Sequence, residues 1–387
     1  MRVLIVIPDL APATGGPVTT VLGLAGALAV RGHAVAIATT DFGLDVLPTL
    51  NGVDFHVFPC LYASRRWSPR LCSFLRREVT RYDLVSVHTL WQFPTWAAAA
   101  ACRAAGVRYV VTPHGMLEAW SLSQKAWKKQ AYAAFVEGKT IRTAAALHFT
   151  AEAERVGSRT FGSRAPAYVV PLGLSRSAYE DLPAPGVFRR RFPELVEKQL
   201  ILFLGRLHYK KRPDVALLAF SEVAREFPDA VLVLAGPGEA RYVSDLQAEV
   251  QRLGLDGQVV FTGLLQGRAV QEALVDADIF VLPSLHENFG LAVAEAMAAG
   301  CPVVVSPEVA LAPDIEKYGA GVVVDGEVDG LRHVLRQLLK DENRRHAMGQ
   351  NGRQLILDQF TRDRVAQQMV EVYEDILRGT RTSSAWR

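Results

Sequence analysis

The residues best suited to chemistry lie in short stretches after expected strands, and the richest stretch is Leu282–Gly300, LPSLHENFGLAVAEAMAAG. Glu287 in its loop and Glu295 on the following helix could each accept hydrogen bonds from the hydroxyls of a polyol. Glu295 could instead simply complement the positive end of the helix dipole. Backbone amides at a helix N-terminus bind anions, and the amides expected here are those of Phe289, Gly290 and Leu291.

A second stretch, GRLHYKKRP at Gly205–Pro213, places Arg206 and Lys211 in a loop directly after the strand expected at Leu200–Leu204. Arginine offers a rigid fork of donors and lysine a mobile point charge, and the two together suit a diphosphate. Loop cations are often merely solvated. The position at the carboxyl end of a strand, where α/β sheets bind ligands, favours the ligand role.

Glycines follow two other expected strands. Gly15 and Gly16 lie between the strand expected at Val3–Ile7 and the helix expected at Pro17–Arg31. Paired glycines let backbone amides approach an anion, so a structural turn and a phosphate or sugar contact are both open. The stretch is not GxGxxG, which disfavours a nicotinamide site. Gly236, in GPG, is expected to form a turn at the corresponding edge of a second sheet.

Histidines also follow expected strands. His114 in PHGML comes directly after Tyr109–Thr112, at the carboxyl end where ligands bind, and His88 is a similar but weaker candidate. Asp276 and Asp278 have a spacing that can bind a divalent cation. They immediately precede the strand expected at Ile279–Leu282, however, and therefore lie at its amino end. No other His, Cys or acidic cluster has metal-ligand spacing, so we expect no metal site.

The elements that must position these stretches form two series, in which short β-branched runs alternate with helix-period segments. This rhythm is typical of an α/β fold with a doubly wound parallel sheet. We therefore predict two Rossmann-like domains that face each other across a cleft. The predicted divisions are an N-terminal domain at 1–170, a linker at 171–198, a C-terminal domain at 199–358, a terminal helix at 359–378 and a flexible tail at 379–387.

Composition excludes several classes of protein. The chain has 387 residues, of which 50% are apolar and 21% charged, so disorder is excluded. Four cysteines without a CxxC pair argue against a disulfide scaffold and predict a reducing compartment. The N-terminus does not resemble a signal peptide, and no window of 18 apolar residues is present. We expect a cytoplasmic protein, at most peripheral on the inner face of a membrane.

The net charge of +3 conceals an asymmetry. Residues 1–186 carry a net +7 and the remainder a net −4, and the segment 60–142 alone carries a net +9. Aromatic residues are interspersed with these cations. They are Trp67, Trp120, Trp127 and Tyr132. The segment is either a solvated face or a surface for an anionic membrane or lipid substrate. A nucleic-acid partner is not expected.

Taken together, Gly15-Gly16, GRLHYKKRP, the stretch from Pro283-Ser284 to Glu295 and GCPVV resemble the retaining nucleotide-sugar glycosyltransferases of group 1, also called family 4. The two glutamates stand eight apart, as in the E-x7-E motif of that family. The resemblance covers nearly the whole chain. It implies a GT-B fold, with the donor site mostly in the second domain, the acceptor site mostly in the first, and the terminal helix crossing back to the first domain.

The resemblance implies a role for each matching position. Arg206 and Lys211 would bind the donor diphosphate, Glu295 the ribose hydroxyls, and Glu287 the donor sugar. His114 would face the sugar near the reacting carbon. The remaining donor-binding positions would be Gly15, Gly16, Gly236, Gly263, Leu264, Asn288, Phe289, Gly290 and Leu291. Arg212 stands where the family often has glycine, which leaves open whether Lys210 or Lys211 reaches the phosphate.

The implied reaction moves a hexose-type sugar from a UDP- or GDP-sugar to a glycan or polyprenyl-diphosphate-linked acceptor, in polysaccharide, exopolysaccharide or lipopolysaccharide biosynthesis. His114, Glu287, Arg206 and Lys211 would carry it without a metal or other cofactor. Retention suggests front-face attack, with Glu287 as a covalent nucleophile the alternative. A sugar-nucleotide epimerase of the same fold is the second enzyme hypothesis. A non-enzymatic two-lobed sugar-binding protein is disfavoured by the paired cations.

Overall fold

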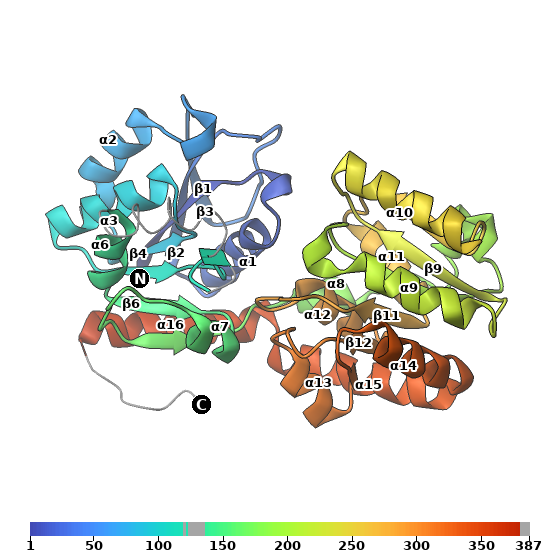
Figure 1. Ribbon diagram of the computed structural model, residues 1–387. Helices are drawn as coiled ribbons and strands as arrows, with labels where there is room; N and C mark the ends of the chain where they lie inside the picture. The colour runs from blue at the N-terminus through green and yellow to red at the C-terminus, as the bar shows by residue number, and fades with distance from the viewer. Residues whose placement is uncertain (119–120, 123–135, 380–387) are drawn as a thin grey trace. The chain divides into compact units, whose positions relative to one another are not determined.

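The chain divides into two compact units, and the computed structural model describes residues 1–118, 121–122 and 136–379 of it. The first unit consists of Met1–Gly173 and the chain from Arg362 onward, whereas the second is the continuous stretch Leu174–Thr361. Each unit is a parallel sheet with helices on both of its faces (Figure 1). The prediction of two Rossmann-like α/β domains is therefore confirmed.

The first unit contains a seven-stranded sheet in the order β3-β2-β1-β4-β5-β6-β7, with parallel neighbours throughout the described part. The strands are β1 Arg2–Asp9, β2 Ala34–Thr40, β3 Val53–Phe58, β4 Leu84–His88, β5 Tyr109–Thr112, β6 Ala146–Phe149 and β7 Ala167–Val169. The chain reverses its progress across the sheet between β1 and β4. Ligands of doubly wound sheets bind at such a switch point, beyond the carboxyl ends of the strands.

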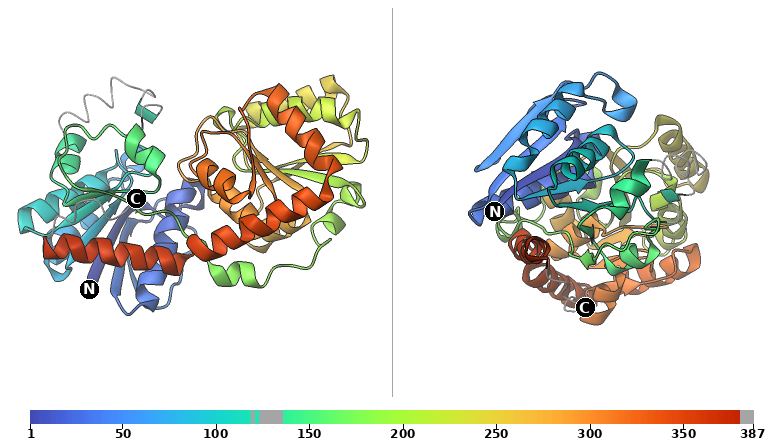
Figure 2. Two further views of the ribbon diagram at one scale, coloured as in Figure 1. Left: turned by 90° about the horizontal axis from the view of Figure 1, so that it is seen from below. Right: turned by 90° about the vertical axis from the view of Figure 1, so that its left-hand side faces the viewer.

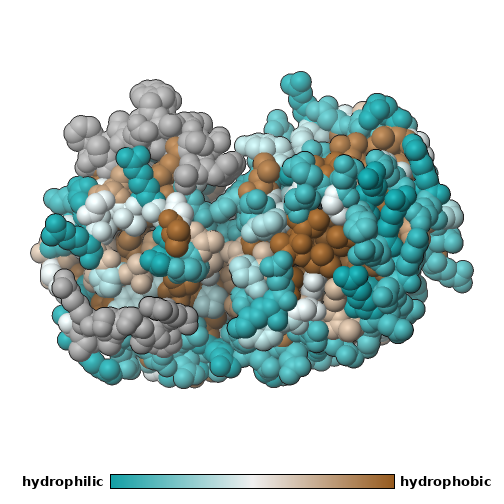
Figure 3. All heavy atoms as spheres, turned by 60° about the horizontal axis from the view of Figure 1, so that its bottom comes forward, coloured by the Kyte–Doolittle hydropathy of each residue, from teal (hydrophilic) through white to brown (hydrophobic). Residues whose placement is uncertain are grey.

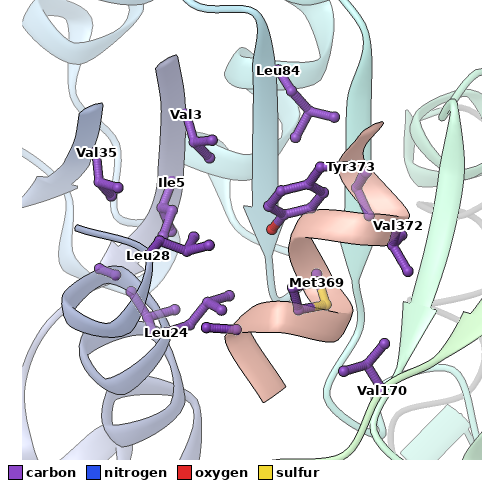
Figure 4. Close-up of a cluster of buried hydrophobic side chains, with 14 of the residues drawn as sticks. Val3, Ile5, Leu24, Leu28, Val35, Leu84, Val170, Met369, Val372 and Tyr373 are labelled. Carbon is purple, nitrogen blue, oxygen red and sulfur yellow. The ribbon is translucent and has the colours of Figure 1, made fainter. Parts of the chain in front are cut away.

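Helices cover both faces of this sheet because strand side chains alternate between them. Val3 and Ile5 of β1 point to the face covered by α1 (Gly16–Val30) and α16 (Arg362–Arg378), as Figure 4 shows. Leu4 of the same strand packs on the other face. That face is covered by α2 (Pro69–Glu78), α3 (Phe93–Ala105) and α6 (Gly138–Arg142). The short α7 (Glu152–Gly157) follows β6.

Helix α16 belongs to the core of the first unit although it is far from it in sequence. Met369, Val372 and Tyr373 are at most 1% exposed and pack with α1 and the sheet (Figures 2 and 4). At its beginning, Asp363 forms an ion pair with Arg31 at 3.0 Å. The first unit is thus completed by a helix that follows the whole of the second unit in the sequence.

The second unit contains a six-stranded parallel sheet in the order β10-β9-β8-β11-β12-β13. Its strands are β8 Gln199–Leu204, β9 Ala230–Ala235, β10 Val259–Gly263, β11 Ile279–Leu282, β12 Val303–Val305 and β13 Gly321–Val323. Its helices are α8 Arg176–Glu180, α9 Pro213–Ala224, α10 Ala240–Leu253, α11 Arg268–Asp276, α12 Leu291–Ala298, α13 Ala312–Tyr318, α14 Val328–Lys340 and α15 Glu342–Gln359. The switch point lies between β8 and β11.

The segment 171–198, expected to be a linker, is instead mostly a folded part of the second unit, which begins at Leu174. Phe188 is fully buried, and its ring packs on Phe192 with centroids 5.0 Å apart. The guanidinium of Arg189 donates to a carboxylate oxygen of Asp278 at 3.0 Å. The Pro, Gly and charged residues of this stretch therefore belong to an irregular segment that packs on the second unit, and not to a free linker.

The surface gives no sign of a membrane-crossing segment in the described residues, where no helix is long and apolar enough to span a bilayer. The face in Figure 3 is mostly hydrophilic, with hydrophobic residues reaching it in limited areas. All four cysteines are free. Burial raises the pKa of the Cys102 thiol to about 12 and raises that of Cys301 as well, so both are packing residues rather than nucleophiles.

Candidate functional site

In the second unit, the loops after β8, β9, β10 and β11 meet at the carboxyl edge of the sheet. Neighbouring loops are joined by backbone hydrogen bonds, from Gly205 to Ala235 at 2.9 Å and from Gly236 to Gly263 at 2.8 Å. The amide of Leu285 likewise donates to the carbonyl of Lys210 at 2.8 Å. The sheet order therefore brings together the basic, glycine and acidic stretches that are separate in the sequence.

The centre of this edge is an ion pair between Lys211 and Glu287, whose side chains are only 18% and 16% exposed. The hydroxyl of Ser284 donates to the same carboxylate oxygen of Glu287 at 3.1 Å. The backbone of Glu287 pairs with the chain around Val309. The amide of Glu287 donates to the carbonyl of Glu308 at 3.0 Å, and the carbonyl of Glu287 accepts from the amide of Ala310 at 3.1 Å. Both the position and the ionic partner of Glu287 are thus fixed.

The other basic residues of the loop differ in their surroundings. Arg206 is exposed, and no hydrogen bond or ion pair engages its guanidinium within the described ranges. Arg212 has a φ of 54°, a left-handed conformation that favours glycine, and its guanidinium forms an ion pair with Glu327 at 3.2 Å. The resemblance left open whether Lys210 or Lys211 reaches the phosphate. In the structure, the ammonium group of Lys211 contacts Glu287.

Helix α12 begins beside Glu287. Gly290, with a φ of 90°, is its N-cap, and the first helical bond runs from the amide of Ala294 to the carbonyl of Gly290 at 3.0 Å. The amides of the first turn, including Leu291, therefore have no acceptor within the helix. Phe289 is buried against Phe360, with ring centroids 5.8 Å apart. Asn288 precedes it, and the partly exposed Glu295 follows in the second turn.

Gly263 and Leu264, two of the expected donor-binding positions, lie at the end of β10. Gly263 has a φ of 69°, and the side chain of Leu264 is 59% exposed. Asp276 and Asp278 lie at the amino end of β11, as expected, and are structural. A carboxylate oxygen of Asp276 accepts from the amide of Arg189 at 3.0 Å, and one of Asp278 accepts from the amide of Leu200 at 2.7 Å. Among the described residues, no group of three or more His, Cys, Asp or Glu is arranged to hold a metal ion.

In the first unit, Gly15 and Gly16 begin α1 at the carboxyl edge of the sheet. Gly15 is the N-cap, with a φ of 75°, and its carbonyl accepts from Val18 at 3.0 Å. The loop in front of it is braced by Asp9, which is 3% exposed and accepts from Arg66 at 2.6 Å. Nothing in the local sequence predicts this contact, because Arg66 lies among other arginines of a basic run.

His114, after β5, is the other candidate of the first unit. Its φ of 52° is left-handed, and the next residue, Gly115, donates its amide to Glu154 at 2.6 Å. Nε2 of His114 lies 3.0 Å from Nδ1 of the buried His88. Desolvation lowers the pKa of His114 to about 3, with a contribution from the nearby His148. The imidazole is therefore neutral at physiological pH.

Lowering the pH from 7.5 to 5 is expected to destabilise the first unit. His148 donates Nε2–H to the carbonyl of Val170 at 2.9 Å, and burial lowers its pKa to about 4, against about 6.5 when unfolded. Because the pKa of His148 is lower in the folded than in the unfolded protein, its full contribution to folding stability is present above pH 6.5. That contribution is lost as the pH falls toward 4. At pH 5 the loss from His148 is about 2 kcal/mol. Melting temperatures at both pH values measure it.

Two matched variants distinguish the contribution of His148 from other effects of low pH on the melting temperature. His148→Asn should show a lower melting temperature at pH 7.5 but a smaller drop at pH 5, whereas replacing the exposed His333 with Asn should leave the drop unchanged. An equal drop in His148→Asn and in the unaltered protein would contradict the assignment.

Two family models match the chain. The one described as "Glycosyl transferase 4-like domain" matches residues 15–173, and "Glycosyl transferases group 1" matches residues 187–355. The chain belongs to the group 1 glycosyltransferases. The matched ranges correspond closely to the two units.

Some relatives of this glycosyltransferase match nearly its whole length. The GDP-mannose-dependent alpha-(1-6)-phosphatidylinositol monomannoside mannosyltransferase of Mycobacterium tuberculosis is 26% identical over 98% of each chain. The D-inositol 3-phosphate glycosyltransferase of Xylanimonas cellulosilytica is 29% identical over 93% of this chain and 91% of its own. HepE of Anabaena, solved in complex with UDP and glucose, has a TM-score of 0.78 at 18% identity, covering 97% of this chain and 100% of its own. The expected GT-B fold is confirmed.

The candidate residues of the glycosyltransferase are divided between its units. His114, Gly15 and Gly16 lie in the first unit, and the others lie in the second. The residues that hold these candidates in place were not predicted from the sequence. These are Asp9, Arg66, Ser86, Glu154, Ser284 and Tyr373. One signal was available, since Ser86 and His88 alternate in an otherwise apolar strand and therefore share one face.

Proposed function

We propose that this glycosyltransferase is a retaining hexosyltransferase that uses a UDP- or GDP-sugar. The acceptor is a glycan or a polyprenyl-diphosphate-linked glycan in the synthesis of a polysaccharide, exopolysaccharide or lipopolysaccharide. The ion pair of Lys211 and Glu287, beside Arg206 and the N-terminus of α12, carries the proposal. The UDP and glucose in HepE and the GDP-mannose in the name of the mycobacterial relative support a nucleotide-sugar donor.

The proposed chemistry begins with the leaving diphosphate. As the bond between the sugar and the phosphate oxygen breaks, negative charge grows on the diphosphate. Arg206, Lys211 and the first-turn amides of α12 stabilise that charge, and this is the main catalytic contribution. Because two side-chain cations and a helix N-terminus supply this compensation, we propose that no metal or other cofactor is required.

Retention of configuration is proposed to arise from front-face attack. The acceptor hydroxyl forms its bond to the sugar on the face from which the diphosphate departs, and a phosphate oxygen takes the hydroxyl proton. Glu287 is bonded by both Lys211 and Ser284, which lowers its reactivity as a nucleophile. This supports a role for Glu287 in holding sugar hydroxyls rather than in a covalent intermediate. His114, from the first unit, is proposed to contact the transferred sugar.

Nucleotide binding tests the donor assignment directly. UDP or GDP is expected to raise the melting temperature of the protein, since a ligand that binds only the folded state stabilises it. Replacing Glu295 with Ala should weaken that binding about 10-fold, because a charged hydrogen bond to ribose contributes about 1.5 kcal/mol. Replacing the exposed Glu316 of α13 with Ala is the matched control and should bind as the unaltered protein does.

Two results would redirect this proposal. Stabilisation by none of UDP, GDP, ADP and their sugars would refute the donor site. Conversion of a nucleotide sugar to its epimer without any acceptor would instead identify an epimerase of the same fold.

We further propose that the first unit meets an anionic membrane surface on the inner face of the membrane. On its described part, Arg65, Arg76 and Arg77 are exposed, and Leu61 and Tyr62, which lie close to Arg65 in the chain, are 64% and 60% exposed. Cations next to exposed apolar side chains suit a surface of anionic lipid headgroups. Arg66 does not contribute, because it is paired with Asp9. Lys128 and Lys129, with Trp120, Trp127 and Tyr132, lie outside the described residues.

Vesicle flotation tests the surface. Replacing Arg65, Arg76 and Arg77 with Gln should reduce binding to vesicles with 30% anionic lipid about 100-fold, since each cation near such a surface contributes about 1 kcal/mol. The control replaces three exposed cations of the second unit, which are Arg225, Arg241 and Lys317. Equal loss in both variants would show that only total charge matters, and the surface would be rejected.

A further inference from the structure

A row of buried polar side chains interrupts the apolar face between α16 and the first sheet. Ser86, His88 and Tyr373 are fully buried, although Leu84 and Met369 around them are apolar (Figure 4). A buried polar group is costly unless it is hydrogen-bonded. These groups are bonded to one another, and the row ends at His114.

Three hydrogen bonds make up the row. The hydroxyl of Tyr373 donates to Oγ of Ser86 at 3.2 Å, and Oγ of Ser86 lies 3.0 Å from Nε2 of His88. Nδ1 of His88 lies 3.0 Å from Nε2 of His114. Tyr373 comes from α16 and Ser86 and His88 from β4, while His114 follows β5, so three elements of one unit are linked.

Each hydrogen bond of this row is donated in the same direction, from Tyr373 toward His114. Because Ser86 accepts from Tyr373, its own buried hydroxyl hydrogen is satisfied by donating to Nε2 of His88. A neutral imidazole carries one N–H, so His88 must hold its proton on Nδ1 and donate it to Nε2 of His114. His114 must then carry its own proton on Nδ1. Burial keeps both rings neutral, because it lowers the pKa of each.

The backbone at the end of the row is also held in an uncommon conformation. His114, Thr89 and Trp91 all have left-handed φ angles, of 52°, 68° and 68°. Such angles cost of order 1 kcal/mol or more for residues with a side chain and persist only where surrounding contacts enforce them. The bond from Gly115 to Glu154 and the bond from His88 are two such contacts. The surroundings thus fix the placement of the His114 ring.

We propose that Tyr373, Ser86 and His88 are positioning residues that orient His114 and fix its tautomer, so that Nδ1–H is the donor it offers to the transferred sugar. This inference rests on the proposed function, in which His114 contacts that sugar. A neutral imidazole with a fixed N–H can donate to a sugar hydroxyl or ring oxygen without a change of charge. It also needs no reorientation when the sugar binds, which is the advantage of a preorganised site.

Nitrogen NMR of histidine-labelled protein tests the row without substrate. The expected spectrum has both His88 and His114 as Nδ1–H tautomers, with signals assigned from His88→Asn and His114→Ala. Tyr373→Phe removes only the terminal hydroxyl. It should give mixed tautomers at both rings and lower kcat about fivefold, the effect of one neutral hydrogen bond, with KM for the donor unchanged.

Three variants provide the controls. His88→Asn keeps a donor near the position of Nδ1 and should retain about 10-fold more activity than His88→Leu, which has none. Tyr109→Phe removes another buried tyrosine hydroxyl of the same unit, one that donates to the carbonyl of Thr140 at 2.7 Å. It should leave the His114 signals and kcat unchanged.

The results that overturn the inference are distinct from those that overturn the proposed function. An Nε2–H tautomer at His114 in the unaltered protein would refute the row, as would unchanged signals and kcat in Tyr373→Phe. Because these spectra need neither donor nor acceptor, they decide the point even if nucleotide binding refutes the donor site.

Discussion

Replacing Lys211 with Met is expected to lower kcat/KM for the donor by about 10²–10³-fold, the effect of removing one group that stabilises charge in the transition state. The ammonium group lies at the carboxyl edge of the second sheet and forms an ion pair with Glu287. Its loss removes one of the charges that would neutralise the leaving diphosphate. It also leaves a mostly buried carboxylate without its cation, which lowers stability.

Companion variants separate the two effects of this substitution. Combining Lys211→Met with Glu287→Gln removes the unpaired charge, so it should restore the melting temperature but not the activity. Lys198→Met breaks an ion pair with the 72% exposed Asp229, and should change neither property appreciably. If the double variant regained activity together with stability, Lys211 would be structural and its role at the diphosphate would be refuted.

Replacing Gly236 with Ala is expected to destabilise the second unit by about 3 kcal/mol or more, as severe overpacking does. A Cβ at this position would lie 1.9 Å from the carbonyl oxygen of Gly205, a backbone atom that cannot move aside without displacing the loop after β8. The φ of 142° at Gly236 adds backbone strain. The same loop carries Arg206 and Lys211, so nucleotide affinity should fall as well.

Gly254→Ala is the matched control for backbone strain alone. Gly254 ends α10 with a φ of 70°, and nothing lies within 4 Å of the position of a Cβ. Its replacement should cost only about 1 kcal/mol and leave nucleotide binding unchanged. Urea denaturation of both variants measures the difference. Similar losses at the two positions would show that the close approach of the β8 and β9 loops relaxes easily.

The central strands of both sheets could be predicted because they are buried on both faces. Tyr109–Thr112 and Ile279–Leu282 coincide with β5 and β11, since continuous apolar runs of this length are typical of parallel strands. The edge strand β3 was not predicted. Its residues are mostly half-buried and include Asp54 and His56, so the apolar run is broken. Helix α2 was also missed, because its charged residues were interpreted only as a basic surface.

The candidate site could be predicted as separate stretches but not as an arrangement. Motif spacing identified Lys211 and Glu287, yet they are 76 positions apart, and only the order of β8 and β11 in the sheet brings them into contact. Tyr373 and Ser86 are 287 positions apart, and nothing in the sequence around either residue indicates that they form a hydrogen bond. Contacts of this kind depend on how elements pack, which the spacing of residues within each element does not encode.

The return of the chain at Arg362 has a consequence for synthesis on the ribosome. Residues 1–173 emerge first but lack α16, so Tyr373 and Met369 cannot yet cover their face of the sheet. The second unit is continuous and can fold as soon as its own last residues appear. The first domain to be translated is therefore the last to be completed. Until then its apolar face is exposed, which makes chaperone binding during translation most useful to the N-terminal half.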